Sequence, residues 1–378
     1  MSGARVEVVD LARAAACEGA WRGLSGRALE ANVFGEPDFI LAALSHFARA
    51  DRLRLLFVWR DEPEEQLIGA VVLELPRIPF GFGVARIWRS DQAGLAAVLL
   101  DRDAAEPALA AVLDWLGEAG PRTIGLMLPT SDASGPTMAA VHALALRRGA
   151  QSHQFGQKNR AVLIAASKLA RGFEGALPKK RLKEWGRQLR RLKERGDIGF
   201  RTASDEAAIE KFLTLEARGW KGAQHTALGA DAGLAAFTRS MLAGLAQRGR
   251  LAVHLLERDG AALAIGVVLR AGDRAFYWKT AYDESYAEYS PGLQLTLELS
   301  RLQQRDPAIT ATDSCAIEGH PMIDRLWTAR LALVDCVIAL RPGQARALRV
   351  WLAGETARRR LREAAKRLIN PLRGRKRS

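Results

Sequence analysis

The chain has 378 residues, of which 48% are apolar, and its formal net charge is +14. A chain of this length usually splits into two hydrophobic cores, and this apolar content excludes wholesale disorder. No run approaches the roughly 18 apolar residues that a membrane-spanning helix needs. The N-terminal stretch also lacks the basic-then-apolar layout of a signal peptide, so we expect a cytoplasmic protein.

Cysteine and histidine usage argues against a metal site or a disulfide framework. Cys17, Cys315 and Cys336 are far apart and odd in number, which suits a reducing compartment. The six histidines form no pair at metal-ligand spacing. We therefore expect no structural metal.

The positive charge is concentrated in two segments. Residues 168–201 hold 12 basic and 4 acidic residues, and residues 341–378 hold 13 basic and 2 acidic ones. Together they carry +19, against +14 for the whole chain, so the remainder carries −5. Such segments attract polyanions, whether RNA, anionic lipid or a phosphate-bearing cofactor, although a solvated helix face explains them equally well. Because the remainder shows no broad basic groove, nucleic acid is the least favoured partner.

The first half alternates helical and strand-like patterns. A helix begins at Glu36-Pro37-Asp38, because proline suits the first helical position, and continues with apolar residues at helical spacing. Apolar runs predict strands at 53–59, 67–75 and 84–89. A helix at 104–119, a strand at 123–128, a helix at 134–148 and a strand at 160–166 follow.

A basic helix, roughly 178–195, bridges to the second half, which repeats the order of elements. A strand at 199–203 precedes helices at 205–220 and 231–247, the first opened by Ser204 and two acids that suit a helix N-terminus. Strands at 251–257, 262–270 and 275–282 are separated by Asp/Gly turns that favour antiparallel hairpins. A helix at 291–304, a strand at 309–314, a helix at 321–331, a strand at 333–340 and an amphipathic basic helix at 344–369, ending before Asn370-Pro371, complete the chain.

This order predicts an α/β fold in which a mixed sheet with helices on its faces occurs twice. We assign residues 1–167 to a first domain, residues 168–343 to a second one and residues 344–378 to a basic tail.

All four tyrosines lie between Tyr277 and Tyr289. Tyrosine carries a hydroxyl on an apolar ring, so this cluster suits a half-wet site better than a core strand. Alternation along the strand predicts that Tyr277, Lys279 and Ala281 share one face and that Trp278, Thr280 and Tyr282 share the other. A lysine in mid-strand is more often exposed than functional, but the loop that follows favours function here.

That loop ends at Ser290-Pro291-Gly292 and opens a strong helix. Ser290 suits the N-cap, Pro291 suits the first helical position, and Gly292 allows close approach to the backbone. Free amides at such a helix start bind anions readily. An ordinary capped helix is the alternative.

These residues belong to a set of ordered motifs that resembles one family. WKTAYD (278–283), YSPG (289–292) and DSCA (313–316) resemble the cellulose-biosynthesis-type (CelD-like) branch of the GNAT acyltransferases. EARGWKG (216–222), IDRLW (323–327) and EPDF (36–39) are similar to the same branch. The resemblance spans roughly residues 34–340.

The resemblance implies tandem GNAT folds related to the Fem-type aminoacyltransferases, with acyl-coenzyme A as the usual donor. It places the donor pyrophosphate on the backbone of Tyr289, Ser290, Pro291, Gly292 and Leu293, which stand where the family usually has Gln/Arg-x-x-Gly-x-Gly/Ala. The corresponding point of the first half, near residues 90–95, also lacks that motif. The first domain is therefore expected to be a non-catalytic support or an acceptor-binding half.

Acyl transfer to an amine needs a base and oxyanion stabilisation. Asp313 is the first candidate for the base, with a turn-capping carboxylate as its alternative, and Glu318 and His320 come next. Tyr282 is expected to donate to the leaving thiolate and Lys279 to orient a substrate, whereas Cys315 is expected to fill the core. The acceptor-binding candidates are Trp220, Lys221, Trp278 and Asp283.

The sequence thus predicts an N-acyltransferase that uses acyl-coenzyme A and acts on an amino sugar or another envelope or polysaccharide precursor. Two alternatives remain: a Fem-like enzyme that takes its acyl group from aminoacyl-tRNA, and a non-catalytic GNAT-fold binding protein. The apolar side of the tail helix, which includes Trp351 and Leu361, suits either an anionic membrane surface or packing on the protein body.

Overall fold

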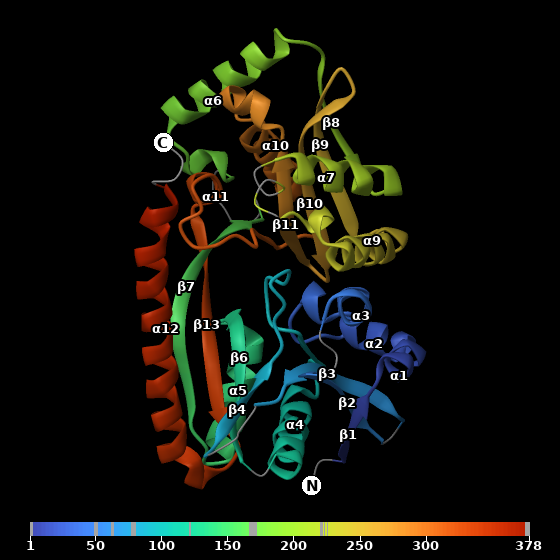
Figure 1. Ribbon diagram of the computed structural model, residues 1–378. Helices are drawn as coiled ribbons and strands as arrows, with labels where there is room; N and C mark the ends of the chain where they lie inside the picture. The colour runs from blue at the N-terminus through green and yellow to red at the C-terminus, as the bar shows by residue number, and fades with distance from the viewer. Residues whose placement is uncertain are drawn as a thin grey trace.

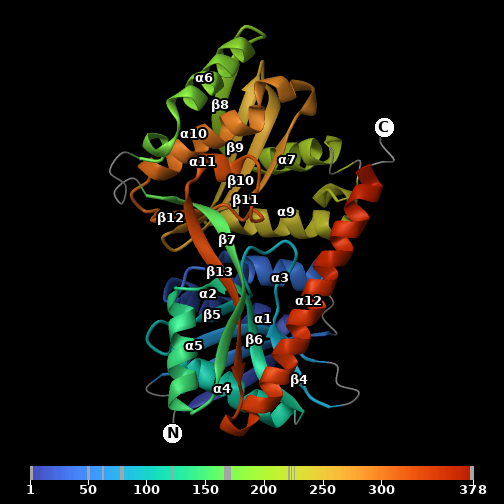
Figure 2. The ribbon, with the colours of Figure 1, turned by 90° about the vertical axis from the view of Figure 1, so that its left-hand side faces the viewer.

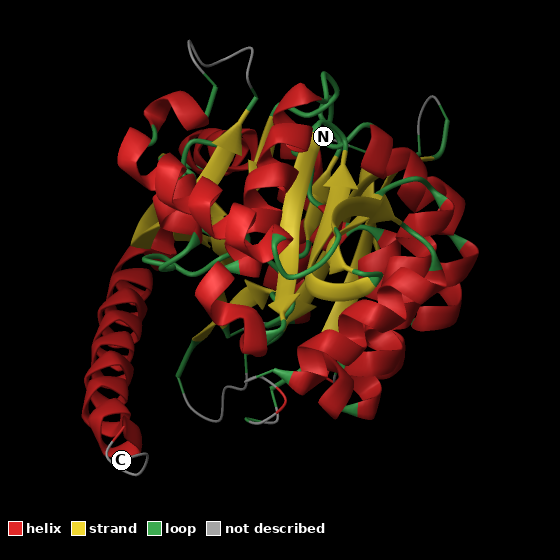
Figure 3. Ribbon diagram, turned by 90° about the horizontal axis from the view of Figure 1, so that it is seen from above, coloured by secondary structure: helices red, strands yellow, loops and turns green. Residues whose placement is uncertain are grey.

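The computed structural model describes residues 3–48, 52–61, 64–76, 81–120, 122–165, 172–219, 222, 224 and 226–374. One continuous 13-stranded mixed sheet runs through these residues in the order β1-β2-β3-β4-β6-β13-β7-β12-β11-β10-β9-β8, with β5 paired to β3. Figure 3 shows helices on both faces of the strands. The predicted mixed α/β architecture is confirmed.

Apolar runs form the strands, which are β1 (Ala4–Val9), β2 (Leu53–Arg60), β3 (Gln66–Glu74), β4 (Gly83–Ile87), β5 (Val98–Leu100), β6 (Thr123–Asp132), β7 (Ser152–Ile164), β8 (Ile198–Ala203), β9 (Leu251–Arg258), β10 (Ala261–Ala271), β11 (Arg274–Tyr282), β12 (Ala311–Asp313) and β13 (Ala329–Ala339). The principal helices are α1 (Leu11–Ala16), α2 (Glu18–Gly26), α3 (Pro37–His46), α4 (Ala105–Ala119), α5 (Pro136–Arg147), α6 (Lys179–Lys193), α7 (Glu206–Arg218), α9 (Ala232–Gln247), α10 (Pro291–Arg305), α11 (Ile323–Leu326) and α12 (Ala345–Gly374). Within the described residues, no helix combines the length and apolarity that a membrane crossing requires.

The two halves of the chain build the sheet in the same way. In the first half, β1 to β4 pair antiparallel and β4 then pairs parallel with β6. In the second half, β8 to β11 pair antiparallel and β11 then pairs parallel with β12. This repeat corresponds to the two tandem units predicted from the sequence.

The last strand of each half belongs to the sheet of the other half. β7, from the first half, pairs with β12, whereas β13, from the second half, pairs with β6. β7 and β13 also pair with each other along most of their length, and Figure 1 shows them side by side on the left of the molecule, next to α12. The predicted domain boundary at residue 167 lies outside the described residues, and the two sequence blocks exchange strands around it.

Helices cover the two faces of this sheet from different parts of the chain. α4 and α5 pack on one face of the first half, whereas α1 to α3 pack on the other face and continue into the core under α7 and α9. α10 and α11 cover the opposite face of the second half. The site described below lies on the second half.

The EPDF motif holds the two halves together. Glu36 forms a buried ion pair with Arg250 of the second half. Asp38 accepts from Arg22 of α2 and from Arg248, with N–O distances of 2.8 and 3.3 Å. The ring of Phe39 packs edge-on against Phe237 of α9, with the ring centroids 5.2 Å apart. This motif is therefore an interface element in the structure.

α12 docks on the sheet by its first half. Leu348 is fully buried on β4, β6 and β13, and Glu355 is buried between Arg86, Arg358 and Arg359. Figure 2 shows α12 on the opposite side of the sheet from α4 and α5. These arginines lower the pKa of Glu355 to about 2 despite its burial. For this part of the tail, the structure shows packing on the protein body, which was one of the two alternatives left open by the sequence.

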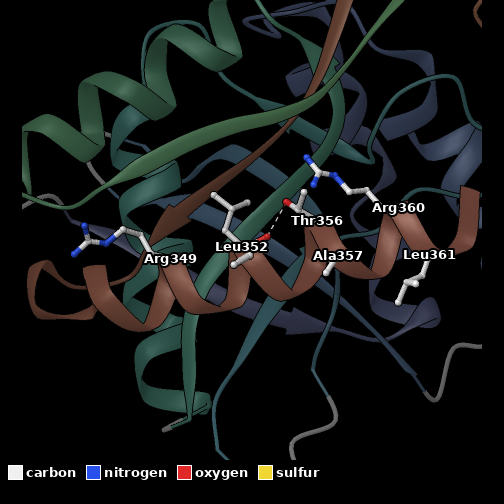
Figure 4. Close-up of a pocket in the computed structure, with 7 residues that line it drawn as sticks. Arg349, Leu352, Thr356, Ala357, Arg360 and Leu361 are labelled. Atoms are coloured by element: carbon white, nitrogen blue, oxygen red, sulfur yellow. Dashed lines mark hydrogen bonds between the residues drawn. The ribbon is translucent and has the colours of Figure 1, made fainter.

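A shallow groove runs along the same helix. It has a volume of about 680 Å³, and its lining, part of which Figure 4 labels, consists of Arg349, Leu352, Ala353, Thr356, Ala357, Arg360 and Leu361. All the lining residues belong to α12, so the groove is a feature of the helix surface and gives no sign of a ligand.

Three predicted boundaries were wrong. β7 begins at Ser152 rather than at residue 160, because its polar first part is held by pairing with β13 and not by burial. α11 is a single turn, since the chain turns into β13 at Ala329. α12 continues past Pro371 to Gly374, although Pro371 lacks the amide hydrogen that a helix bond needs.

Candidate active site

A cavity of about 800 Å³ opens where β11 and β12 separate. Their parallel pairing covers only Arg274 to Phe276 on β11 and Ala311 to Asp313 on β12. Beyond this point, residues 277–282 and 314–316 line opposite walls of the cavity. In the described part of the chain, β11 therefore pairs with β12 only as far as Phe276, and the cavity begins beyond that point.

A β-bulge at Trp278 changes the predicted face alternation. Val267 and Val268 of β10 pair with Lys279 and Tyr277, so Trp278 has no partner across the strand pair. Tyr277 packs in the core under α10, whereas Trp278 and Ala281 pack together in the core under α7. The prediction that Tyr277 and Ala281 share a face was wrong, because a bulge adds one residue to the alternation.

The first turn of α10 forms the floor of the cavity. Ser290 occupies the N-cap position, as predicted, but its backbone is left-handed (φ 52°) and its side chain makes no capping hydrogen bond. Pro291 has no amide hydrogen, so the first free amide is that of Gly292. A β-carbon at Gly292 would lie 3.5 Å from the ring of Tyr282, which places that ring beside the helix start.

A chain of buried hydroxyl groups ties this turn to the cavity wall. The Tyr277 hydroxyl lies 3.1 Å from Oγ1 of Thr296, which in turn donates to the carbonyl of Gly292. Ser300 continues the chain and accepts from Nε1 of Trp327 at 2.8 Å. Burial raises the pKa of Tyr277. Tyr277 and Trp327 therefore hold α10 in place.

The geometry of Asp313 favours the turn-capping alternative over the base that we preferred. The residue is buried behind the wall and is not among the described residues that line the cavity. One carboxylate oxygen accepts from Arg160 at 2.7 Å and the other from the amide of Cys315 at 2.8 Å. Both oxygens are committed to the protein, because a buried carboxylate needs such partners.

His320 lines the cavity, but it presents a donor and not a base. Its Nδ1 accepts from the backbone amides of Met322 and Ile323, each at 3.3 Å. Burial lowers the pKa of His320, so the ring is neutral near pH 7 and its proton sits on Nε2. Glu318 accepts from the amide of Asn159, outside the described cavity lining.

Lys279 and Tyr282 line the cavity, as the tyrosine cluster suggested. The Lys279 ammonium lies 5.5 Å from the centre of the Trp278 ring, within cation–π range. Tyr282 is about one-third exposed, with 36% of its surface accessible. Cys315 also lines the cavity, and burial together with Asp313 raises the pKa of its thiol, so it is a poor nucleophile.

The remaining predicted site residues divide into three groups. Ser290, Pro291, Gly292 and Leu293 line the cavity. Tyr289 is buried behind them and accepts from Arg195, and Asp283 caps the following turn through the amide and hydroxyl of Ser285. Trp220 and Lys221 lie outside the described residues.

Four charged residues that our site prediction did not include also line the cavity. Glu216 and Glu284 are the carboxylates of the described lining, and Arg181 and Arg325 bring guanidinium groups from α6 and α11. Glu216 is 3% exposed and accepts from the amide of Leu228 at 2.9 Å. Glu216 belongs to the EARGWKG motif and Arg181 to the basic helix, but only the fold brings them together.

The corresponding region of the first half is almost closed. A pocket of about 20 Å³ lies beside the end of β6, lined by Glu30, Asn32, Asp132 and their neighbours. Glu30 and Asp132 both face Arg274 of the second half, at 3.6 Å. Across the described residues, no cluster of three or more potential metal ligands occurs in either half.

Residues 179–306, which include α6, β8 to β11 and most of the cavity wall, match the acetyltransferase (GNAT) domain family. The second half carries a GNAT-type domain. The first half of this tandem GNAT-like fold repeats its strand order. No curated protein matches the sequence at a significant level.

Three solved structures resemble almost the whole chain. The first is a conserved protein of unknown function from Bacteroides thetaiotaomicron, with a TM-score of 0.54 and 13% identity over 89% of this chain and 99% of that one. FemX has a TM-score of 0.54 and 10% identity, over 91% of this chain and 99% of its own. The C-terminal domain of a protein assigned as a lysylphosphatidylglycerol synthetase from Agrobacterium fabrum has a TM-score of 0.51 and 10% identity, over 90% and 96% of the two chains. At these identities the likeness is one of fold.

Proposed function

We propose that the protein is an N-acyltransferase that moves an acyl group from acyl-coenzyme A to an amine in the cavity between β11 and β12. The observation that carries this proposal is the separation of these two strands beside the free first turn of α10. A thioester arm inserted between the strands runs along the β12-facing edge of β11, where backbone amides can stabilise negative charge on the acyl oxygen.

The residues around the α10 turn fit a phosphate-bearing donor. The Gly292 amide points from the positive end of a helix, and Arg181 and Arg325 flank the same cavity. α6 is fixed to this turn, since Gln294 donates to the carbonyl of Trp185 at 2.9 Å. The cavity therefore offers such a donor both cationic side chains and a helix N-terminus, although the glycine-rich motif that the family usually has is absent from the sequence.

We assign the base to Glu216. In the reaction, the amine nitrogen bonds to the acyl carbon, the carbon–sulfur bond breaks, and the amine proton goes to a cavity carboxylate. Tyr282 donates a proton to the departing thiolate. The proton that Glu216 took from the amine then returns to Tyr282 through solvent. Glu216 suits this role because it lines the cavity, whereas Asp313 does not.

The acceptor class and the cellular setting are proposed from the resemblance to the CelD-like branch. We propose an amino sugar or another envelope or polysaccharide precursor as acceptor, handled in the cytoplasm or at the inner face of the membrane. The basic face of α6 supports an anionic substrate. This helix carries eight cationic side chains, and within the described residues only that of Arg187 forms an ion pair.

A second candidate donor is aminoacyl-tRNA. The same basic face of α6 favours it, because a run of exposed cations beside the cavity suits a phosphate backbone. The two donors differ in salt dependence, since a long phosphate backbone loses affinity much more steeply as salt rises.

The substitution Glu216→Gln tests the mechanism. Glutamine keeps an acceptor for the Leu228 amide but cannot take a proton, so we expect the rate of thiol release from acetyl-coenzyme A in the presence of amine acceptors to fall about 10²- to 10⁴-fold. Binding of acetyl-coenzyme A, measured by calorimetry, is expected to stay unchanged.

Glu318→Gln is the matched control, since Glu318 also accepts one backbone amide but does not line the cavity. It should leave the rate unchanged. Unaltered turnover in Glu216→Gln removes the assignment of the base, and failure of the wild-type protein to bind any acyl-coenzyme A removes the proposed donor.

A further inference from the structure

One wall of the cavity depends on a buried arginine that lies outside the cavity itself. Arg160, on the exchanged strand β7, has a side chain that is only 7% exposed. It donates to the Asp313 carboxylate at 2.7 Å and to the carbonyl of Gly94, in the first half, at 3.1 Å. The guanidinium thus joins the end of β12 to a loop of the other half.

Asp313 connects Arg160 to a residue that lines the cavity. Its second oxygen holds the amide of Cys315 at 2.8 Å. Cys315 has a left-handed backbone, with φ at 51°, which costs free energy for a residue with a side chain and persists only where its surroundings enforce it. Cys315 and its neighbours Ser314 and Ala316 form the cavity wall that faces β11.

The loop that contains Gly94 touches the opposite wall as well. The carbonyl of Gln92 accepts from Nε1 of Trp278, the bulged residue of β11, at 2.7 Å. A β-carbon at Gly94 would lie 3.0 Å from the sulfur of Cys315 and 2.9 Å from the ring of Phe34. The loop at residues 90–94 therefore contacts β11 and the turn after β12 at once.

We propose that Arg160 is a positioning residue that, through Gly94 and Asp313, sets the separation of the two cavity walls, so that the first half completes the acyl-transfer site of the second. The kinetic consequence of this inference rests on the proposed function. The structural consequence, the restraint of the Cys315 turn, does not.

Arg160→Met removes the guanidinium and keeps a side chain of similar length. It leaves Asp313 buried without its cation, which a protein interior does not tolerate without rearrangement. We expect the Cys315 turn to open locally and its alkylation by iodoacetamide, followed by mass spectrometry of the peptides, to become about tenfold faster or more. With acetyl-coenzyme A, kcat should fall about 10²-fold and KM for the donor should change little.

The matched control is Arg27→Met. Arg27 also bonds one buried carboxylate and one backbone carbonyl, those of Asp101 and Leu67, at 2.8 and 3.1 Å, but in the first half and away from the cavity. This variant should leave the alkylation of Cys315 and the kinetics near their wild-type values. Arg160→Lys should be intermediate, because an ammonium cannot hold both oxygens in the fixed fork of a guanidinium.

Buried Cys336 reports whether the fold is intact. If Arg160→Met exposes Cys336 too, the variant has unfolded, and Arg160→Lys, which keeps a cation beside Asp313, decides instead. Wild-type alkylation of Cys315 in the deciding variant overturns the proposal. If the wild-type protein shows no turnover at all, the proposed function fails while the alkylation result still tests the role of Arg160.

Discussion

Asp313 and Glu216 carry the same functional group and lie in comparable motifs, yet only Glu216 lines the cavity. Asp313 follows a strand that ends beside the site, so its position in the sequence suggested a base. Its two oxygens are instead taken by Arg160 and Cys315. Which carboxylate faces a cavity depends on residues more than a hundred positions away, and a motif does not contain that information.

His254 provides a prediction at the scale of one residue. Its ring is 5% exposed on β9, with Nδ1 placed 2.9 Å from the hydroxyl of Thr202. Burial lowers the pKa of His254 from 6.5 to about 4. In the unfolded chain His254 therefore binds a proton below pH 6.5, whereas in the folded chain it does so only below about pH 4. The free energy of unfolding therefore falls as the pH falls from 6.5 to about 4.

We expect the lowered pKa of His254 to make the free energy of unfolding roughly 2 kcal/mol smaller at pH 5 than at pH 7. Urea unfolding of the wild-type protein and of His254→Gln at both pH values measures it, since the difference between the two proteins cancels the other titrating groups. Equal pH dependence in both proteins contradicts the prediction.

At the scale of elements, the docking of α12 provides the next prediction. Leu348 is fully buried and approaches the backbone of Gly125, where a β-carbon would lie 3.1 Å from it. Leu348→Ala should lower the free energy of unfolding by about 2–5 kcal/mol, because it leaves a cavity in a packed core.

Leu361→Ala is the control on the same helix. Leu361 is 72% exposed, so its truncation should change stability by less than about 0.5 kcal/mol. Thermal or urea unfolding measures both variants, and equal effects would show that α12 is not held by its Leu348 side.

Helix and strand boundaries were predictable wherever one side of an element is buried. α7, α9 and α10 begin and end close to the predicted residues, because their apolar spacing reflects a core contact. The polar first part of β7 was missed for the opposite reason: its hydrogen bonds to β13 stabilise it without an apolar face. The bulge at Trp278 left no local signal, since it depends on the register of β10.

At the scale of the whole molecule, strand exchange makes the two halves interdependent. Without β13 the edge of β6 is unpaired, and without β7 the edge of β12 is unpaired. We therefore expect residues 1–167 and residues 168–378, produced separately, to show no cooperative thermal unfolding by circular dichroism.

Mixing the two fragments should restore a cooperative transition, because each supplies the strand that the other lacks. A sharp transition in either fragment alone would show that the exchange is dispensable. This outcome would also weaken the inference that the first half completes the site, since Arg160 reaches Asp313 from an exchanged strand.

The sequence by itself determined the fold class, the order of elements and the region of the site, because apolar periodicity, turn residues and a run of ordered motifs are local properties of the chain. It also located the tyrosine cluster and the first turn of α10. The tertiary structure alone decided which side chains meet: Glu216 and Arg181 at the cavity, Asp313 behind its wall, and β7 and β13 exchanged between the halves. These are contacts between distant segments, and their geometry is set by packing and strand pairing, for which no short stretch of sequence carries a signal.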